Sequence, residues 1–221
     1  MNLRVLNILW ESFPKLFMAA LTVTMPLTIL SFICGMVIAM FTALVQTAKI
    51  PVLRHIARFY VWIIRGTPLL VQLWIVYFGL PSIGILIPAF PSATIVLSLS
   101  IGAYCSETVR AAIGSVPAGQ FEAGYCIGMN YWQIIFRIVL PQALKTAFPP
   151  LSNSLISLVK DTSLAYSVAI VEVMATANRI GARSYDYFWL YVEAAFVYLI
   201  FCTVLTWLQH YCEQKLERKK A

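Results

Sequence analysis

The sequence predicts an all-α integral membrane protein with five membrane-spanning helices. Of its 221 residues, 61% are hydrophobic and only 11% are charged, whereas soluble domains carry about one quarter charged residues. Long uncharged runs recur along the chain, each near the roughly 20 residues that cross the hydrocarbon core of a bilayer. The connections between these runs are short, so we expect residues 1–221 to form a single membrane domain.

The expected spans cover about residues 16–45, 59–80, 92–111, 142–163 and 187–211. The first follows Lys15 and meets no charge until Lys49, so it is too long for the apolar core of a cleaved signal peptide and is retained. Pro26 predicts a kink in this span. Hydroxyl side chains along it can bond back to helix carbonyls, and they belong to Thr22, Thr24, Thr28 and Ser31.

The second span is interrupted, and the third ends in charged residues. Arg65-Gly66-Thr67-Pro68 falls inside the second, where the backbone can open. A basic connection punctuated by Pro51 precedes that span, and an uncharged external turn at residues 82–91 follows it. Glu107 and Arg110 are three residues apart and therefore share one face of the third helix.

The fourth span is the least regular. Between Lys145 and Lys160 lies a short uncharged run that contains Pro149-Pro150 and the polar Ser152-Asn153-Ser154. This pattern predicts a broken helix that faces a protein interior rather than lipid. The more polar residues 165–185 predict a short external helix before the last span.

Between the third and fourth spans lies an amphipathic segment. Ser115 is a plausible N-cap, and Pro117 is tolerated in a first helical turn. Gly128-Met129-Asn130 supplies a stop. We therefore expect a helix at about residues 117–129, which is too short to be stable in water alone and must dock on something.

The same segment carries a spaced motif that resembles the cytoplasmic coupling loop of bacterial ABC-importer membrane subunits. That loop reads EAA, three residues, G, nine residues, I-x-L-P, and Gly124 departs from it where the second Ala stands. The resemblance implies a type I ABC importer fold, with a cytoplasmic coupling helix that contacts an ATPase; a surface loop at the lipid headgroups is the alternative. The matching residues are Glu122, Ala123, Gly124, Gly128, Ile138, Leu140 and Pro141.

Three further stretches, RGTPLLVQL, SVPAGQFEAG and LSNSLISLVKDTSLA, resemble the polar amino-acid permease family of ABC importers over nearly the whole chain. The resemblance implies a second permease subunit, identical or a sister chain, together with cytoplasmic ATP-binding subunits and an extracytoplasmic solute-binding protein. The chain has no P-loop of the form GxxxxGK[ST]. ATP is therefore expected to be hydrolysed by a partner, with no cofactor in this chain.

A transported amino acid needs opposite charges along its path, because a bare carboxylate or ammonium in hydrocarbon is costly. Arg65 offers a bidentate carboxylate partner, and Asp161 offers an acid. By resemblance, Arg65 and Lys160 hold the substrate carboxylate and Asp161 holds its amino group. A snorkelling or ion-paired Arg65 and a solvated span end at Lys160-Asp161 are the alternatives. The predicted substrate-binding set is Arg65, Thr67, Pro68, Asn153, Ser154, Lys160 and Asp161.

Ser154 is predicted to read the substrate side chain. It lies seven residues before Asp161, two turns back on the same helix face. Relatives for cationic amino acids often carry an acid there, so the neutral hydroxyl disfavours arginine, lysine and histidine. The sequence as a whole most resembles those of cystine-type permeases. Glutamine or glutamate is the alternative substrate.

Basic residues predict the orientation in the cytoplasmic (inner) membrane. With the coupling loop inside, nine basic residues lie inside and four outside, which places the N-terminus outside and the C-terminus in the cytoplasm. The inner set is Lys49, Arg54, Arg58, Arg137, Lys145, Lys215, Arg218, Lys219 and Lys220, and the outer set is Arg4, Lys15, Arg179 and Arg183.

Other classes of protein fit less well. The net charge of +7 is scattered among apolar segments, so no nucleic-acid partner is expected. Five cysteines and two histidines show no ligand-like spacing, so we expect no metal site. No Ser/His/Asp or HExxH arrangement supports a catalytic residue, and the chain is not expected to be an enzyme. An ion-coupled secondary transporter stays open as an alternative, because intramembrane charges and a broken helix also occur in such carriers.

Overall fold

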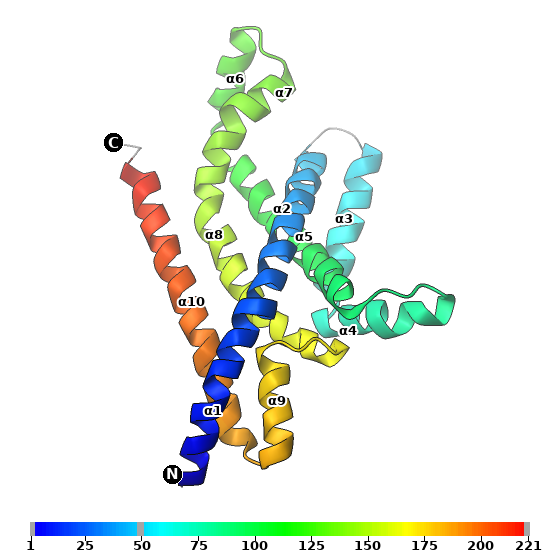
Figure 1. Cartoon of the computed structure of the whole chain (residues 1–221). Coiled ribbons are helices and arrows are strands. Elements are labelled where there is room, and N and C mark those ends of the chain that lie inside the picture. Colours follow the sequence, from blue (N-terminus) through cyan, green and yellow to red (C-terminus); the bar gives the residue numbers. More distant parts are fainter. Residues whose placement is uncertain (1–2, 48–50, 219–221) are drawn as a thin grey trace.

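A computed structural model describes residues 3–47 and 51–218, and within these ranges the chain forms helices and loops without a strand. Three lysines of the predicted inner set of basic residues lie outside the described residues: Lys49, Lys219 and Lys220. The N-terminus and α9 lie at one end of the molecule, whereas α6, α7 and the C-terminal end of α10 lie at the other (Figure 1).

The first span is one helical run from Leu3 to Thr47, and it begins earlier than the expected residue 16. It comprises α1 (Leu3–Ala19), a π-helical turn (Ala20–Thr24) and α2 (Met25–Thr47). The irregularity predicted at Pro26 takes the form of this π-helical turn, because the proline beside it has no N–H to continue the α-helical pattern.

Only some of the hydroxyls in this run bond to helix carbonyls. Thr22 donates to the Met18 carbonyl and Thr28 to the Thr24 carbonyl, both at 2.8 Å. The hydroxyls of Thr24 and Ser31 are buried and have no hydrogen-bond partner among the described residues. The prediction was therefore right for Thr22 and Thr28 and wrong for Thr24 and Ser31.

The second span, expected at residues 59–80 with an interruption, begins earlier and consists of two helices. Helix α3 (Pro51–Gly66) absorbs the basic connection, and the chain then turns by 104° into α4 (Leu69–Trp74). A π-helical turn and a 3₁₀ turn extend α4 to Ile83. The interruption predicted at Gly66-Thr67-Pro68 is confirmed, and it is a sharp corner because Pro68 takes an extended ψ of 134°.

Helix α5 (Ala89–Gly114) crosses the centre of the molecule and packs most extensively on α2. The two helices approach closely at Gly35, where an added Cβ would meet Ile101 Cγ2 at 2.6 Å. Helix α8 packs on the other side of α5, so the main hydrophobic core lies between these three helices.

Two helices form a hairpin between α5 and α8. Helix α6 (Ala118–Cys126) agrees with the predicted short helix, and α7 (Tyr131–Ile134) follows it. Ser115 was predicted to cap α6, but it lies at the end of α5 instead. Its hydroxyl donates to the Ala112 carbonyl at 2.8 Å. Asn130 starts α7 with a capping box rather than only ending α6, because its side chain and that of Gln133 bond reciprocally to backbone N–H groups.

The fourth span is longer and more regular than predicted. Helical structure begins at Tyr131 rather than near residue 142, and α8 (Leu140–Asp161) continues unbroken through Pro149-Pro150. The two prolines free the carbonyls of Lys145 and Thr146, four residues back, and both of these residues are exposed.

At the opposite end, α9 (Val173–Ser184) is the predicted short helix, and α10 (Tyr187–Arg218) closes the chain. The fully buried Glu172 caps α9 by accepting from the Ala175 N–H at 2.8 Å, and it also accepts from the Tyr198 hydroxyl of α10. Ser12 of α1 donates to Glu193 of α10. These buried polar contacts join α1, α9 and α10 into a second packed unit.

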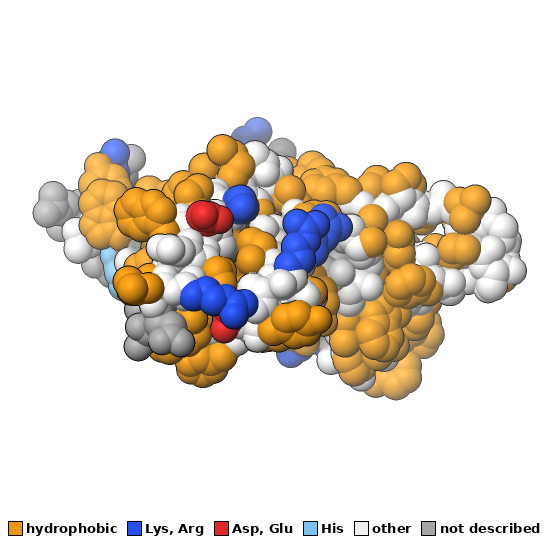
Figure 2. Space-filling view, turned by 60° about the horizontal axis from the view of Figure 1, so that its bottom comes forward, with side chains coloured by type: hydrophobic (Ala, Val, Ile, Leu, Met, Phe, Trp, Pro, Cys, Tyr) orange, Lys and Arg blue, Asp and Glu red, His pale blue; other side chains and the backbone are white. Residues whose placement is uncertain are grey.

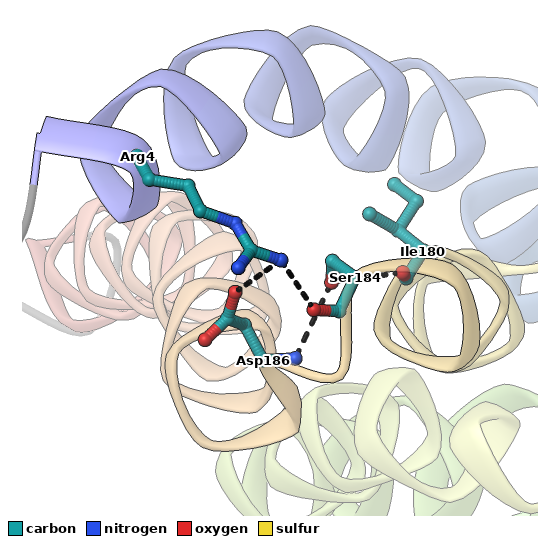
Figure 3. Close-up of polar contacts among 4 residues, drawn as sticks. All are labelled: Arg4, Ile180, Ser184 and Asp186. Carbon is teal, nitrogen blue, oxygen red and sulfur yellow. Dashed lines mark hydrogen bonds and ion pairs between the residues drawn. The ribbon is translucent and has the colours of Figure 1, made fainter.

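The first turn of α1 also contacts the corner between α9 and α10. Arg4 donates to the Ser184 carbonyl at 3.0 Å and lies 3.9 Å from the Asp186 carboxylate (Figure 3). Ser184 in turn donates to the Ile180 carbonyl at 3.0 Å.

Three of the described helices are long and apolar enough to cross a membrane by themselves: Leu3–Thr47, Ala89–Gly114 and Tyr187–Leu216. Two bent pairs raise the number to as many as five if each pair counts as one span; they are Pro51–Gly66 with Leu69–Ile83 and Tyr131–Val168 with Val173–Ser184.

Candidate functional site

A polar-lined cavity of about 440 Å³ lies between α4, α5 and α8. Polar side chains come mainly from one face of α8, where positions 154, 157 and 161 are spaced by one turn each. Helix α5 contributes the opposite wall. The lining residues are Leu69, Ser100, Ile101, Tyr104, Asn153, Ser154, Ser157, Asp161 and Leu164.

The cavity joins three of the sequence-predicted residues: Asn153, Ser154 and Asp161. Asp161 is the last residue of α8 and is half-buried, so its carboxylate borders the cavity with part of its water shell removed. Ser154 donates to the Pro150 carbonyl at 3.0 Å, which leaves its oxygen as an acceptor toward the cavity. The expected common face of Ser154 and Asp161 is therefore present.

Arg65 reaches this cavity through an aromatic ring. Its guanidinium carbon lies 5.2 Å from the ring centroid of Tyr104, a cavity residue of α5. This is cation–π distance, which holds the planar guanidinium beside the cavity while its N–H groups stay available to an anion. Arg65 does not itself line the cavity; it stacks over Tyr104, which lines the same cavity as Asp161.

Thr67 and Pro68 form the corner between α3 and α4 instead of the cavity wall. The Thr67 hydroxyl donates to the Ile63 carbonyl at 2.9 Å and ends α3. Gln72 closes the corner, because its Nε2 lies 2.8 Å from the Thr67 hydroxyl and 2.9 Å from the Ile64 carbonyl. These contacts fix the end of α3, on which Arg65 stands.

Lys160 is not brought into the cavity. It is exposed, and it lies one turn beyond Ile156, whose carbonyl faces Cys202 of α10 at 4.0 Å. Neighbouring residues of a helix differ by about 100° in direction. Lys160 therefore points toward the α10 side when Asp161 points into the cavity.

Sequence reasoning missed the α5 wall and part of the α8 face. Ser157 could have been found, since it lies three residues after Ser154 on the same face. Tyr104 lies one turn before Glu107 on α5, but nothing in the sequence indicates that Arg65 packs over its ring. Four further lining residues are brought to the cavity only by the packing of the helices: Leu69, Ser100, Ile101 and Leu164.

The predicted coupling residues lie on and below the α6–α7 hairpin, which projects from one end of the molecule (Figure 1). Glu122 and Ala123 are exposed, and the neighbouring Tyr125 and Ile127 expose 52% and 75% of their surface. A helix tip with exposed apolar side chains around one carboxylate is suited to docking on another protein.

Two glycines fix the shape of this hairpin. Gly128 has a φ of +79°, a conformation that favours glycine, and it reverses the chain after α6. Gly124 is buried, and an added Cβ there would meet Ile134 Cγ1 of α7 at 2.6 Å. The departure from the second Ala of the motif therefore accommodates a close contact between α6 and α7.

The last three motif residues connect the hairpin to α8. Ile138 and Leu140 are partly buried, and Leu140 packs against the main core. Pro141 is exposed in the first turn of α8, directly after the π-helical turn Ile135–Val139. The hairpin is therefore continuous, through the π-helical turn, with α8, the helix that carries Ser154 and Asp161.

The chain belongs to the family of binding-protein-dependent transport system inner membrane components, whose model matches residues 35–218. It is a permease subunit of an amino-acid ABC importer, a membrane component of a transporter and not an enzyme.

Individual relatives and a solved structure are similar to the chain over most of its length. The chain is 48% identical over 213 residues to the L-cystine transport system permease protein TcyB of Bacillus subtilis (strain 168), covering 96% of this chain and 91% of that protein. It is 37% identical to the putative glutamine transport system permease protein GlnP of Rickettsia conorii, covering 92% and 95%. A crystal structure of an amino acid ABC transporter with histidines superposes with a TM-score of 0.88 at 31% identity, covering 97% and 100%.

Proposed function

We propose that this chain is the permease of an L-cystine importer, and that the cavity between α5 and α8 binds the transported amino acid. The observation that carries the proposal is a cavity lined by the Asp161 carboxylate and the neutral Ser154, with the Arg65 guanidinium stacked over a third lining residue, Tyr104. The guanidinium would hold a carboxylate and the aspartate an ammonium group. The 48% identity to an L-cystine permease supports cystine.

Glutamine or glutamate is the second candidate, since a putative glutamine permease is 37% identical to this chain. The neutral Ser154 suits either substrate. Cystine has two amino-acid ends, so it would need room beyond one Arg65–Asp161 pair, and the cavity of about 440 Å³ is large enough to hold it.

The proposed topology has five spans, in which each bent pair crosses the membrane once. The α6–α7 hairpin would be the cytoplasmic coupling element, with Glu122 against an ATP-binding subunit. The C-terminal end of α10 lies at the same end of the molecule and the N-terminus at the other (Figure 1), so we place the N-terminus outside and the C-terminus in the cytoplasm.

The outer end would receive the solute-binding protein. Figure 2 shows this end, where lysine and arginine side chains stand among broad hydrophobic surfaces. Arg179 and Arg183 of α9 are both exposed and would suit an acidic docking partner. A second permease copy, or a sister chain, would complete the transporter, and two ATP-driven subunits would switch it between outward-open and inward-open states.

The test is ATP hydrolysis by the chain reconstituted with its ATP-binding subunit and solute-binding protein, scanned across amino acids. Stimulation by L-cystine and its close analogues supports the proposal. Stimulation by glutamine or glutamate instead would replace cystine with the second candidate. Stimulation by arginine or lysine would contradict the role of Ser154, and uptake that persists without the ATP-binding subunit would contradict ATP coupling.

A further inference from the structure

A second polar cavity, of about 450 Å³, lies nearer the end of the molecule that carries α6. The end of α2, the first turns of α3 and the last turns of α5 enclose it. The function proposed above does not use this cavity. Its lining residues are Gln46, Thr47, Arg54, Arg58, Glu107, Arg110 and Gly114.

The two cavities share one helix, α5, and the arginines of α3 connect them. On α3, Arg54, Arg58 and Arg65 fall within roughly 40° of one another around the helix axis, and Arg65 lies about 16 Å farther along it than Arg54. On α5, Tyr104 of the first cavity precedes Glu107 of the second by one turn. Arg65 over the Tyr104 ring therefore stands at the boundary between the cavities.

This arginine face of α3 cannot border hydrocarbon, because a guanidinium at the depth of Arg65 needs water or protein around it. The opposite face of α3 is apolar and exposed, with Ile56 at 60% and Phe59 at 59% exposure, and it suits lipid. On this arginine face, Arg54 and Arg58 line the second cavity, and Arg65 stacks over Tyr104, which lines the first.

The second cavity offers hydrogen-bond donors in excess of acceptors. Glu107 accepts from Arg110 at 2.7 and 3.1 Å, so the charge of Arg110 is compensated. Arg54 and Arg58 form no ion pair with an acidic residue within the described ranges. Gln46 is only 6% exposed, and its Nε2 has no hydrogen-bond partner among the residues that the structure describes.

We infer that this cavity is a second amino-acid subsite, which receives the substrate after it passes Arg65 and Tyr104. Arg54 and Arg58 bind the substrate carboxylate, and Glu107 binds its ammonium group in exchange for Arg110. The arrangement repeats the arginine–carboxylate pairing of the first cavity, which is the pairing that recognises the head of an amino acid. The inference rests on the function proposed above.

Such a subsite raises the fraction of ATP-driven transport cycles that deliver substrate to the cytoplasm. A substrate held beside the cytoplasmic opening no longer occupies the first cavity, so it does not return outward when the transporter resets. Loss of the two arginines leaves the substrate distributed toward the first cavity, and more of it is carried back. The measured quantity is therefore the amount of substrate accumulated per ATP hydrolysed.

The experiment uses the complete importer in sealed vesicles, with labelled L-cystine loaded on the solute-binding protein outside. The double variant R54Q/R58Q is expected to lower the ratio of cystine accumulated to ATP hydrolysed by roughly three- to ten-fold. R54K/R58K keeps both charges and is expected to restore most of the ratio. Lys215→Gln, which removes a charge from the same end of the molecule outside the cavity, is the control and leaves the ratio unchanged.

A ratio in R54Q/R58Q equal to that of the parent chain overturns the inference while leaving the proposed function intact. A loss that appears in vesicles with anionic phospholipid and vanishes in phosphatidylcholine alone also overturns it, because the arginines would then bind lipid headgroups. If R54Q/R58Q does not assemble, Arg58→Gln alone gives the same test with a smaller expected fall. A parent complex without cystine-dependent ATP hydrolysis contradicts the proposed cystine function, and with it this subsite.

Discussion

At the scale of single residues, Asp161 and Lys160 are neighbours in the chain but face different surroundings. Asp161 borders the cavity between α5 and α8, whereas Lys160 is exposed on the α10 side of α8. The resemblance assigned both to the substrate, and the geometry supports only the aspartate as a direct contact. Asp161 therefore has a geometric basis for binding the substrate, whereas Lys160 shares only the sequence motif.

Asp161→Asn should therefore impair uptake far more than Lys160→Gln. Removing the carboxylate costs the charge-assisted contact to the substrate ammonium, which corresponds to a fall of about ten- to one-hundred-fold in kcat/KM. Lys160→Gln is the matched control and should change kcat/KM by less than about two-fold. Uptake kinetics in reconstituted vesicles measure both; equal losses in the two variants would show that Lys160 also binds the substrate.

Ser154 is the residue on which the charge of the substrate side chain should depend. In Ser154→Glu, a carboxylate faces the cavity two turns before Asp161, so stimulation of ATP hydrolysis by L-cystine should fall about ten-fold and stimulation by arginine should appear. Ser154→Ala, which stays neutral, should not gain arginine. An unchanged amino-acid profile in Ser154→Glu would mean that this position does not contact the substrate side chain.

At the scale of elements, the α6–α7 hairpin depends on one close contact. Gly124→Ala restores the residue usual in the motif, but its Cβ would meet Ile134 at 2.6 Å. We expect it to lower the free energy of unfolding by about 1–3 kcal/mol, the usual cost of overpacking.

Thermal unfolding of the purified chain in detergent measures this cost. In the double variant Gly124→Ala/Ile134→Ala, the added methyl group finds the space that the isoleucine leaves. The combined loss of stability should therefore be smaller than the sum of the two single losses. Additive losses would argue against a direct contact between the two positions.

At the scale of the whole molecule, Glu122 lies on α6 in the hairpin and Asp161 at the far end of α8 beside the cavity. Glu122→Lys reverses the charge at the exposed tip of α6 and should abolish stable association with the ATP-binding subunit. Binding of the solute-binding protein at the other end should persist.

Co-purification of the two subunits measures the effect of Glu122→Lys. Glu11→Lys makes the same charge reversal on the exposed surface of α1, at the opposite end of the molecule, and should leave the association intact. If Glu122→Lys still assembles and couples normally, the hairpin is not the contact with the ATP-binding subunit.

The sequence by itself determined the helical class, the interruption at Gly66-Thr67-Pro68 and the short helix before Gly128. Each of these depends on local chemistry: runs of apolar residues, a proline without an N–H, and a glycine that tolerates a positive φ. The shared face of Ser154 and Asp161 was also predictable, because helical periodicity alone places them together.

Only the tertiary structure decided what depends on contacts between distant segments. Pro149-Pro150 indicated a break in α8, yet the helix continues through both prolines. Arg65 meets Tyr104 across 39 positions of the chain, and Lys160 is turned away from the cavity by the packing of α8 on α10. Local patterns specify which residues share a helix face, whereas the packing of helices selects the face that becomes a site.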